Sequence, residues 1–600
     1  MGVVMPISSR TPPQPKPSCR FFAALPLLWA ALVLVLTLTP AADMPVTPVW
    51  ELLSFDTAAH AGVFVVLAGL SRFSLRHQSR WPLLARHAGA AALLVSVLFG
   101  GLIELLQHHM HLGRHGDWTD LLSDAIGAAL AVGVATLWAA RRREPLQLPI
   151  VPLLLLGALL PAIGAPAQDI PRARRTIEKL AAPELHGRGY VQQGEHKAAA
   201  YLRGRLRELK LEPLAPNYTQ PFTLDVNTFP GTVALSVTHV VTLDKVVTKE
   251  LVPGAEFIVA SESKGTSGLL TTSALRLDTL CFFQASAQQA LQRRAWHWLS
   301  TLGTPPFLVL TARDVQRLPT LPPALRQTLD SLPNRIVLVP KLTASLAPAQ
   351  VAGIHIEALN EPVTWYPLNP EYPEDLLTLQ VDAQLQRNYQ TQNLAAVIRG
   401  TAQPDSFLVV SAHYDHLGRM GRNTYFPGAN DNASGVALLL ELAAHYARPE
   451  NRPAYSVVFL LFGAEEAGLV GSRYFVAHPL VPLARIKFLV NLDLLGTGEE
   501  GATVVNGRVF EAPFRCLLAL NNAYHYLPAL GARGRAANSD HFPFSEAGVP
   551  AFFIYTRGGS AAYHDVNDKP AALSLAGFAG AFGLVRDFLG ELGAAPAAKK

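Results

Sequence analysis

Apolar residues are unevenly distributed along the chain. Long apolar runs crowd the first 165 positions, whereas later apolar residues occur in short runs typical of strands and amphipathic helices. The pattern therefore predicts a membrane part followed by a globular part, and buried core helices are the alternative interpretation of the first part. Most of the long runs approach the roughly 20 residues that span a bilayer. They occupy residues 21–40, 57–71, 87–106, 121–140 and 148–165.

Basic residues between these runs favour the membrane interpretation. They gather near the N-terminus, in the 72–86 loop and at Arg141–Arg143, which predicts that these segments lie inside and that everything after about residue 166 lies outside. The fifth run is short and contains three prolines, and Ala165-Pro-Ala167 follows it. We expect a fifth helix that tethers the rest of the chain, with a cleaved internal signal segment as the alternative. Both interpretations place the globular part in the periplasm or outside the cell, next to a bacterial inner membrane.

Ionisable residues also occur within the apolar runs, where they are costly and usually pair or act. Their pattern resembles the VanZ-like membrane family over about 20–145, with Asp124 where asparagine is expected. A structural polar seam between helices is the alternative interpretation. A neighbouring histidine-rich loop, residues 108–115, is expected to be solvated rather than to bind metal. The polar residues that carry the resemblance are Asp56, His60, Glu104, Gln107, Arg114, Asp120 and Asp124.

Composition excludes two other classes of protein. The net charge is +5, but no basic stripe interleaved with aromatic residues follows the membrane part, so nucleic acid is not an expected partner. The chain has three cysteines, and their spacing fits neither a zinc knuckle nor a disulfide framework.

The globular part divides into three segments. Residues 171–215 predict two helices joined by a polar turn, and residues 220–390 mix short strands with Pro-rich joints and one helix near 285–300. From residue 393 strands alternate with helices, which predicts a mixed sheet with helices on both faces. The expected strands are 393–400, 407–413, 455–462, 486–493 and 551–556, and the expected helices are 434–447, 467–478, 511–525 and 571–590.

Acidic residues and histidines stand in five motifs, most of them directly after an expected strand. In open α/β sheets, functional groups gather at the carboxyl ends of strands, so these motifs can converge. Imidazole and carboxylate groups are good zinc ligands, and two histidines with three carboxylates suit two zinc ions per chain with one carboxylate bridging them. The motifs are SAHYDHLG with His413 and Asp415, GANDNASG with Asp431, FGAEEAG with Glu465 and Glu466, NLDLLG with Asp493, and YHDVND with His564.

A zinc pair needs further carboxylates around it. One must take a proton from water and pass it to a leaving amine, and the adjacent Glu465 and Glu466 can divide the roles of base and ligand. Asp415 is placed to hold the far nitrogen of the His413 ring.

The motifs SAHYDHLG, ANDNASG, AEEAGLVGS, NLDLLG, NSDHFPF and YHDVND resemble, in order, the zinc exopeptidases of the aminopeptidase Y and aminopeptidase S type, relatives of glutamate carboxypeptidase. The segment 171–215 resembles that family's opening, and 220–390 resembles its protease-associated insert weakly. The resemblance implies Asp431 as the bridging ligand and leaves open which acid pairs with which histidine. It implies zinc ligation by His413, Asp431, Glu466, Asp493 and His564, general-base catalysis by Glu465, carbonyl polarisation by Tyr563, and a substrate pocket shaped by Ser539, Asp540 and His541.

The resulting prediction is a helical transmembrane bundle followed by an α/β zinc-exopeptidase domain with an inserted lid-like segment. The expected function is an aminopeptidase that cleaves peptide substrates outside the cytoplasm and is anchored in the lipid bilayer. A carboxypeptidase, a glutaminyl cyclase, a catalytically silent binding module, and a membrane domain with an accessory peptidase stay open as alternatives. The expected segments are a tail (1–20), four transmembrane helices (21–145), the fifth apolar segment (146–168), the start of the peptidase domain (169–219), the insert (220–392) and the catalytic core (393–600).

Overall fold

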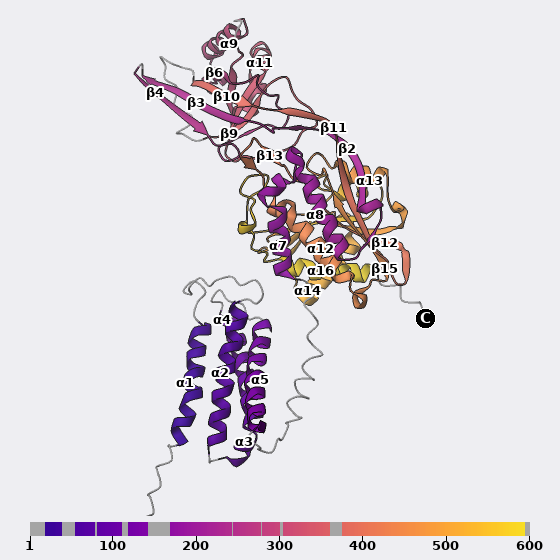
Figure 1. Ribbon diagram of the computed structural model, residues 1–600. Coiled ribbons are helices and arrows are strands. Elements are labelled where there is room, and N and C mark those ends of the chain that lie inside the picture. The colour runs from indigo at the N-terminus through magenta and orange to yellow at the C-terminus, as the bar shows by residue number, and fades with distance from the viewer. Residues whose placement is uncertain are drawn as a thin grey trace, which may run out of the picture. The chain divides into compact units, whose positions relative to one another are not determined.

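The chain folds into two compact units, Met1–Ala165 and Pro166–Lys600. Figure 1 shows helices in the first unit and mixed helices and strands in the second. The computed structural model describes residues 19–38, 55–78, 81–110, 118–141, 169–242, 244–277, 279–300, 304–360 and 375–593.

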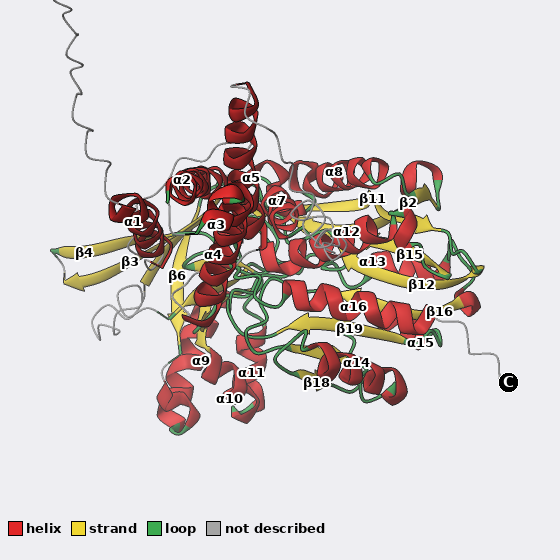
Figure 2. Cartoon of the chain, turned by 90° about the horizontal axis from the view of Figure 1, so that it is seen from below, coloured by secondary structure: helices red, strands yellow, loops and turns green. Residues whose placement is uncertain are grey.

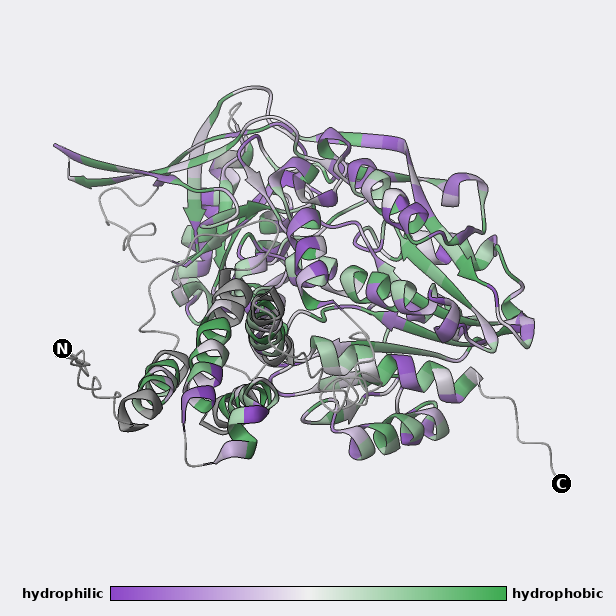
Figure 3. Ribbon diagram, turned by 60° about the horizontal axis from the view of Figure 1, so that its bottom comes forward, coloured by the Kyte–Doolittle hydropathy of each residue, from purple (hydrophilic) through white to green (hydrophobic). Residues whose placement is uncertain are grey.

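Helices make up the described part of the N-terminal unit. The four long ones overlap the first four apolar runs of the sequence, and Figure 3 colours much of them green, the colour of hydrophobic residues. An apolar cluster of Val33, Phe64, Leu67 and Ile103 joins three of them. The helices are α1 (Cys19–Leu38), α2 (Phe55–His77), α3 (Pro82–Arg86), α4 (Ala88–Met110) and α5 (Trp118–Arg141).

The polar residues that resemble the VanZ-like pattern fall mainly on these helices. Asp124 is 1% exposed. Arg114, the apolar run 148–165 and the Ala165–Ala167 motif lie outside the described residues. By length and hydropathy, none of the helices within the described residues qualifies as a membrane span. The polar residues sit as Asp56 and His60 on α2, Glu104 and Gln107 on α4, and Asp120 and Asp124 on α5.

A mixed sheet forms the centre of the C-terminal unit. Its neighbouring strands β15, β12, β16 and β19 run parallel, while β11 runs antiparallel to β15 and β17 runs antiparallel to β19. Figure 2 shows the long strands side by side with helices on both faces. The order is β1 (Glu212–Pro213), β11 (Gln384–Ile398), β15 (Tyr455–Phe462), β12 (Gln403–His413), β16 (Ile486–Leu492), β19 (Ala551–Thr556), β17 (Ala502–Val505) and β18 (Leu530–Ala532), with β2 (Thr219–Thr228) paired to β11.

The alternation of side chains along these strands explains the two layers of helices. On β12, Leu408 and Val410 belong to one apolar cluster, and Phe407 and Val409 belong to another. Successive side chains of a strand point to opposite faces, so each face buries its own cluster. Strand β15 is buried along its whole length, as a strand covered on both faces must be.

The covering helices agree with the predicted positions. The predicted 434–447, 467–478 and 511–525 correspond to α12, α13 and α14, and α16 begins seven residues after the predicted 571. The helices are α7 (Ile170–Leu180), α8 (Gly194–Glu208), α12 (Gly435–Tyr446), α13 (Val470–Ala477), α14 (Glu511–Tyr524), α15 (His541–Glu546) and α16 (Phe578–Gly593).

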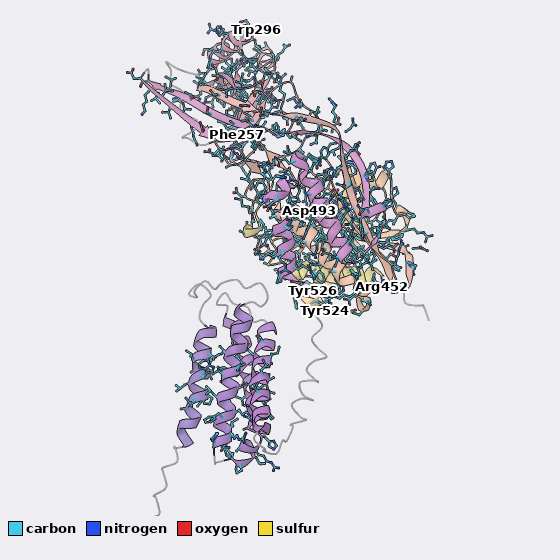
Figure 4. All side chains as sticks on the ribbon, in the orientation of Figure 1. Phe257, Trp296, Arg452, Asp493, Tyr524 and Tyr526 are labelled. Carbon is cyan, nitrogen blue, oxygen red and sulfur yellow. The ribbon has the colours of Figure 1, made fainter. Side chains whose placement is uncertain are left out.

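A second sheet forms the insert. Its described strands run in the order β4-β3-β10-β6-β7-β8-β9-β5. The predicted insert, 220–392, begins and ends within β2 and β11, which pair with each other in the core sheet and lead to the insert in Figure 1. Figure 4 places Trp296, on α9, at the far end of the insert and Asp493 within the core. The elements are β3 (Val233–Thr242), β4 (Lys245–Leu251), β5 (Phe257–Val259), β6 (Leu270–Arg276), α9 (Ala285–Ser300), β7 (Phe307–Thr311), α10 (Ala312–Arg317), α11 (Pro323–Asp330), β8 (Asn334–Val339), β9 (His355–Leu359) and β10 (Asp375–Val381), with the core hairpin β13 (Arg419–Met420) and β14 (Thr424–Tyr425) separate from this sheet.

Candidate metal centre

The ends of the parallel strands bring the predicted acids and histidines together. His413 is the last residue of β12, Asp493 follows β16 directly, and Glu465 and Glu466 follow the end of β15. Asp431 lies in the turn that precedes α12. Because these strands are parallel, their carboxyl ends lie at the same edge of the sheet, where functional side chains of open α/β folds converge.

Asp431 lies between the two histidines. Its Oδ1 is 3.3 Å from Nε2 of His413, and its Oδ2 is 3.1 Å from Nε2 of His564. Nε2 of His413 is also 3.4 Å from Oδ1 of Asp493, and Nε2 of His564 is 3.1 Å from Oε2 of Glu466. The geometry thus pairs His413 with Asp493, the inner pair, and His564 with Glu466, the outer pair.

The distances within each pair fit ligands of one ion. Two ligands about 2.0–2.1 Å from a tetrahedral zinc ion lie about 3.3 Å apart, as these nitrogen and oxygen atoms do. Oδ1 of Asp493 is buried and makes no hydrogen bond of normal geometry with the described residues. The donor atoms of His413, Asp431 and Glu466 lie within 4.8 Å of one another, as do those of His413, Glu465 and Asp493. The residues present therefore fit zinc, and Asp431 faces both pairs of possible ligands.

The adjacent glutamates differ in proton affinity. Burial raises the pKa of Glu465 well above its ordinary range, against the lowering effect of His413. Burial and the charge of Asp431 also raise the pKa of Glu466, but His564 and His416 outweigh them and lower it to about 2. A carboxyl group that binds protons readily suits a base, and one that stays ionised suits a ligand.

Asp415 contacts both the His413 ring and the turn that carries the two glutamates. Its carboxylate is 3.8 Å from Nδ1 of His413, whereas its main-chain oxygen is 3.3 Å away. The carboxylate also accepts hydrogen bonds from the main-chain N–H groups of Glu465 at 3.1 Å and of Glu466 at 3.3 Å. Asp415 therefore fixes the turn that carries both glutamates.

The predicted pocket residues lie behind the cluster. Ser539, Asp540 and His541 are all 0% exposed, and they lie at and just before the start of the short helix α15, which packs near β16. Oγ of Ser539 donates a hydrogen bond to Oδ2 of Asp493 at 2.8 Å and accepts one from Nδ2 of Asn491 at 2.8 Å. Burial raises the pKa of Asp540 to about 7 and lowers that of His541 to about 4. Ser539 therefore supports Asp493, and all three side chains are closed off from solvent.

Tyr563 lies on the open side of the cluster. Its side chain is 43% exposed, and its ring stacks on that of His564 with centroids 4.0 Å apart. Burial and the surrounding carboxylates raise the pKa of the phenol, which therefore keeps its proton and can donate a hydrogen bond.

Two residues that sequence reasoning missed hold the ligands directly. His416 is fully buried, and its Nδ1 is 2.6 Å from Oε1 of Glu466. The carboxylate of Asp568 accepts hydrogen bonds from the main-chain N–H groups of Asn430 at 2.8 Å and Asp431 at 3.0 Å. Both lie in the predicted motifs, His416 as the second histidine of SAHYDHLG and Asp568 as the last acid of YHDVND, so the motifs contained a signal for them.

Arg188 is the third residue that was missed. Its guanidinium is fully buried and donates five hydrogen bonds to main-chain oxygens of Tyr414, Leu180, Pro427, Gly428 and Asp431 at 2.7–3.1 Å. Burial lowers its pKa to about 10. The side chain ties the segment after α7 to the residue beside His413 and to the turn of Asp431, so it braces the frame in which the ligands stand.

Comparison with known proteins identifies both parts of the chain. Residues 393–589 match the model of peptidase family M28, and residues 22–139 match the VanZ/LLP1 model. The chain therefore carries a peptidase family M28 domain and, before it, a VanZ/LLP1 domain, which confirms both resemblances seen in the sequence.

Curated relatives agree with this assignment. Aminopeptidase YwaD of Bacillus subtilis is 30% identical over 191 residues, which cover 30% of this chain and 40% of the relative. An aminopeptidase of Pseudomonas aeruginosa is 34% identical over 24% of this chain and 28% of its own length. A probable zinc metalloprotease of Pyricularia oryzae is 39% identical over 18% of this chain and 22% of its own length. The chain thus spans at most two fifths of these curated relatives.

Solved structures share the fold over a longer stretch. A zinc aminopeptidase from Bacillus subtilis superposes with a TM-score of 0.50 at 19% identity, over 72% of this chain and 96% of that one. A peptidase M28 precursor from Shewanella amazonensis superposes with a TM-score of 0.53 at 16% identity, over 72% of this chain and 95% of that one. The likeness concerns the fold, and it extends well beyond the residues 393–589 of the family match.

Proposed function

We propose that the C-terminal unit is a di-zinc aminopeptidase. The observation that carries the proposal is the position of Asp431, with one oxygen toward His413 and the other toward His564. His413 and Asp493 would hold one ion, His564 and Glu466 the other, and Asp431 would bridge them. Two such ions polarise a carbonyl group and increase the acidity of water.

The residues around the ligands supply the remaining chemistry. Glu465 is partly exposed, so its carboxylate can accept a proton from the attacking water and deliver it to the leaving amine. The phenol of Tyr563 can donate a hydrogen bond to the carbonyl oxygen as negative charge develops there. Asp415 and His416 keep the two glutamates in place.

The charge of the site favours a substrate with a free N-terminus. Two zinc ions would bring four positive charges, which lower the pKa of the surrounding carboxyl groups and favour their ionised forms, and Arg188 adds one positive charge against seven carboxylates. The excess negative charge attracts an ammonium group and repels the carboxylate at the other end of a peptide. The carboxylates of the cluster and its supports are Asp415, Asp431, Glu465, Glu466, Asp493, Asp540 and Asp568.

Matched peptides test the activity. We expect the enzyme to release the first residue of a free peptide and of the same peptide with an amidated C-terminus, and to leave the N-acetylated peptide intact. Cleavage that tolerates acetylation and fails on the amide would identify a carboxypeptidase. Release of ammonia from an N-terminal glutamine without peptide cleavage would identify a glutaminyl cyclase. If the zinc-loaded protein turned over none of these peptides, the result would favour the catalytically silent binding module.

Metal content tests the centre itself. We expect two zinc ions per chain by elemental analysis, and we expect a strong chelator to abolish peptidase activity until zinc is restored. Full activity in the presence of chelator would contradict the proposal.

We further propose that the N-terminal domain anchors the enzyme in a membrane. The VanZ/LLP1 match and the alternation of basic loops with apolar runs support this role. The peptidase would then face the periplasm or the exterior. Cell fractionation should recover the full-length chain with membranes, and protease added to spheroplasts should digest the C-terminal unit. A soluble fragment that begins near Gln168 would instead indicate cleavage after Ala167.

A further inference from the structure

One short segment of the insert reaches the candidate metal centre. Residues 341–345 follow β8 of the insert sheet, and we call them the strap. Their burial alternates, with Leu342 and Ala344 buried in the apolar core of the insert and Lys341 and Thr343 exposed. The strap is therefore anchored to the insert through the side chains of Leu342 and Ala344.

The strap makes two hydrogen bonds with His564. The N–H of Ala344 donates to the main-chain oxygen of His564 at 2.9 Å, and the main-chain oxygen of Ala344 is 3.0 Å from Nδ1 of the His564 ring. A carbonyl oxygen only accepts hydrogen bonds, so Nδ1 must carry the proton. The neutral ring then has its lone pair on Nε2, directed at Asp431 and Glu466, which is the tautomer that a metal ligand requires.

Two further contacts hold the loop that carries His564. Nζ of Lys341 donates to the main-chain oxygen of Ala561 at 2.9 Å. Val566 packs against the apolar core of the insert, and Gly254 approaches it so closely that a Cβ at Gly254 would lie 2.7 Å from Cγ1 of Val566. Contacts of the insert thus reach the loop before, at and after His564.

His413 is held in another way. Its ring is 1% exposed at the end of a central strand, and the partner of its Nδ1 is the main-chain oxygen of Asp415, within the core. Within the described residues, the insert therefore contacts the loop that carries His564, whereas the ring of His413 is held by the core.

From this asymmetry we infer that the strap is a positioning element that sets the affinity of the outer pair for its metal ion. The inference rests on the proposed di-zinc function. His564 lies between the end of β19 and residue 570, outside any helix or strand, so no regular element orients its ring. Main-chain groups that orient a ligating histidine are worth about 10–100-fold in metal affinity.

Zinc release from the full-length chain tests the inference. Wild type should lose two equivalents of zinc to increasing chelator. The variant Ala344→Pro lacks the N–H that binds the His564 main chain, so we expect it to lose one equivalent at an about 10–100-fold lower chelator concentration and to keep the other unchanged. Equal weakening of both equivalents, or of neither, would overturn the inference.

A milder variant covers the case in which proline disrupts the insert. Lys341→Met removes only the hydrogen bond to Ala561. We expect the zinc ion of the outer pair to bind about threefold more weakly, which is the usual effect of one exposed hydrogen bond. Lys245→Met, an exposed position on β4, serves as the matched control and should leave both equivalents unchanged. A Lys341→Met profile identical to that of the control would count against the strap. Wild-type protein that binds no zinc would refute the proposed function instead.

Discussion

The inner and outer pairs of the candidate metal centre are built from the same kinds of side chain on very different supports. His413 and Asp493 stand at the ends of adjacent parallel strands and are buried almost completely. His564 stands on a loop, its side chain is 15% exposed, and a separate part of the chain contacts it through main-chain atoms. The difference teaches that one half of the site comes with the central sheet, whereas the other half depends on how a loop is held.

The largest effect should come from the residue that both halves share. Asp431→Asn keeps the shape of the side chain but removes the charge that faces both histidines. We expect both zinc equivalents to weaken together and turnover to fall on the order of 10⁴-fold. Elemental analysis and steady-state kinetics check this result. Loss of only one equivalent would mean that Asp431 belongs to one half.

The adjacent glutamates should separate chemistry from metal binding. Glu465→Gln removes a proton acceptor, so we expect turnover to fall about 10²–10⁴-fold with two zinc ions retained. Glu466→Gln is the matched control for the same change of side chain one residue away, and it should release zinc from the outer pair. Unchanged turnover in Glu465→Gln would assign the proton transfer to another group.

Substitution of Arg188 should lower the stability of the fold without weakening the zinc affinity of one pair of ligands more than that of the other. Arg188→Met leaves several buried main-chain oxygens without a donor, and we expect the free energy of unfolding to fall by about 3 kcal/mol or more. Denaturant titration measures this, with the exposed Arg175→Met on α7 as control. Arg188→Lys should be intermediate, because a single ammonium group cannot reach carbonyls on every side. A selective loss of one zinc equivalent would contradict the role of a common brace.

The smallest effect should appear in the inner pair alone. Ser539→Ala removes the hydrogen bond to Oδ2 of Asp493, and we expect an about 10-fold weaker inner zinc equivalent with the outer one unchanged. Ser545→Ala on α15 is the control, because the Oγ of Ser545 accepts a hydrogen bond from Asn506 and not from a zinc ligand. Chelator titration of both variants gives the comparison, and a change in the outer equivalent would show that the halves are coupled.

The sequence predicted which acids and histidines gather at the edge of the sheet, because most of the signal is local. His413, Glu465, Glu466 and Asp493 stand at or just after the ends of apolar strands, so their place at the edge of the sheet follows from the strands themselves. The ends of the insert were harder to predict, since β2 and β11 continue the core sheet without any change of composition. The partners of Arg188 and His564 could not be predicted, because main-chain oxygens are present at every residue and leave no trace in a motif. His416 and Asp568 could have been found, since both stand within recognised motifs.

The pairing of β2 with β11 also bears on the order in which the chain folds. Thr228 and Gln384 are 156 residues apart in sequence, yet they are neighbours in the core sheet. Closing so long a loop costs more chain entropy than closing a short one. If the insert folds first, its own sheet brings these two ends together, and the core sheet then has only a short gap to close. The insert would thus act as an early folding nucleus, and mutations that destabilise it should slow the refolding of the catalytic core as well.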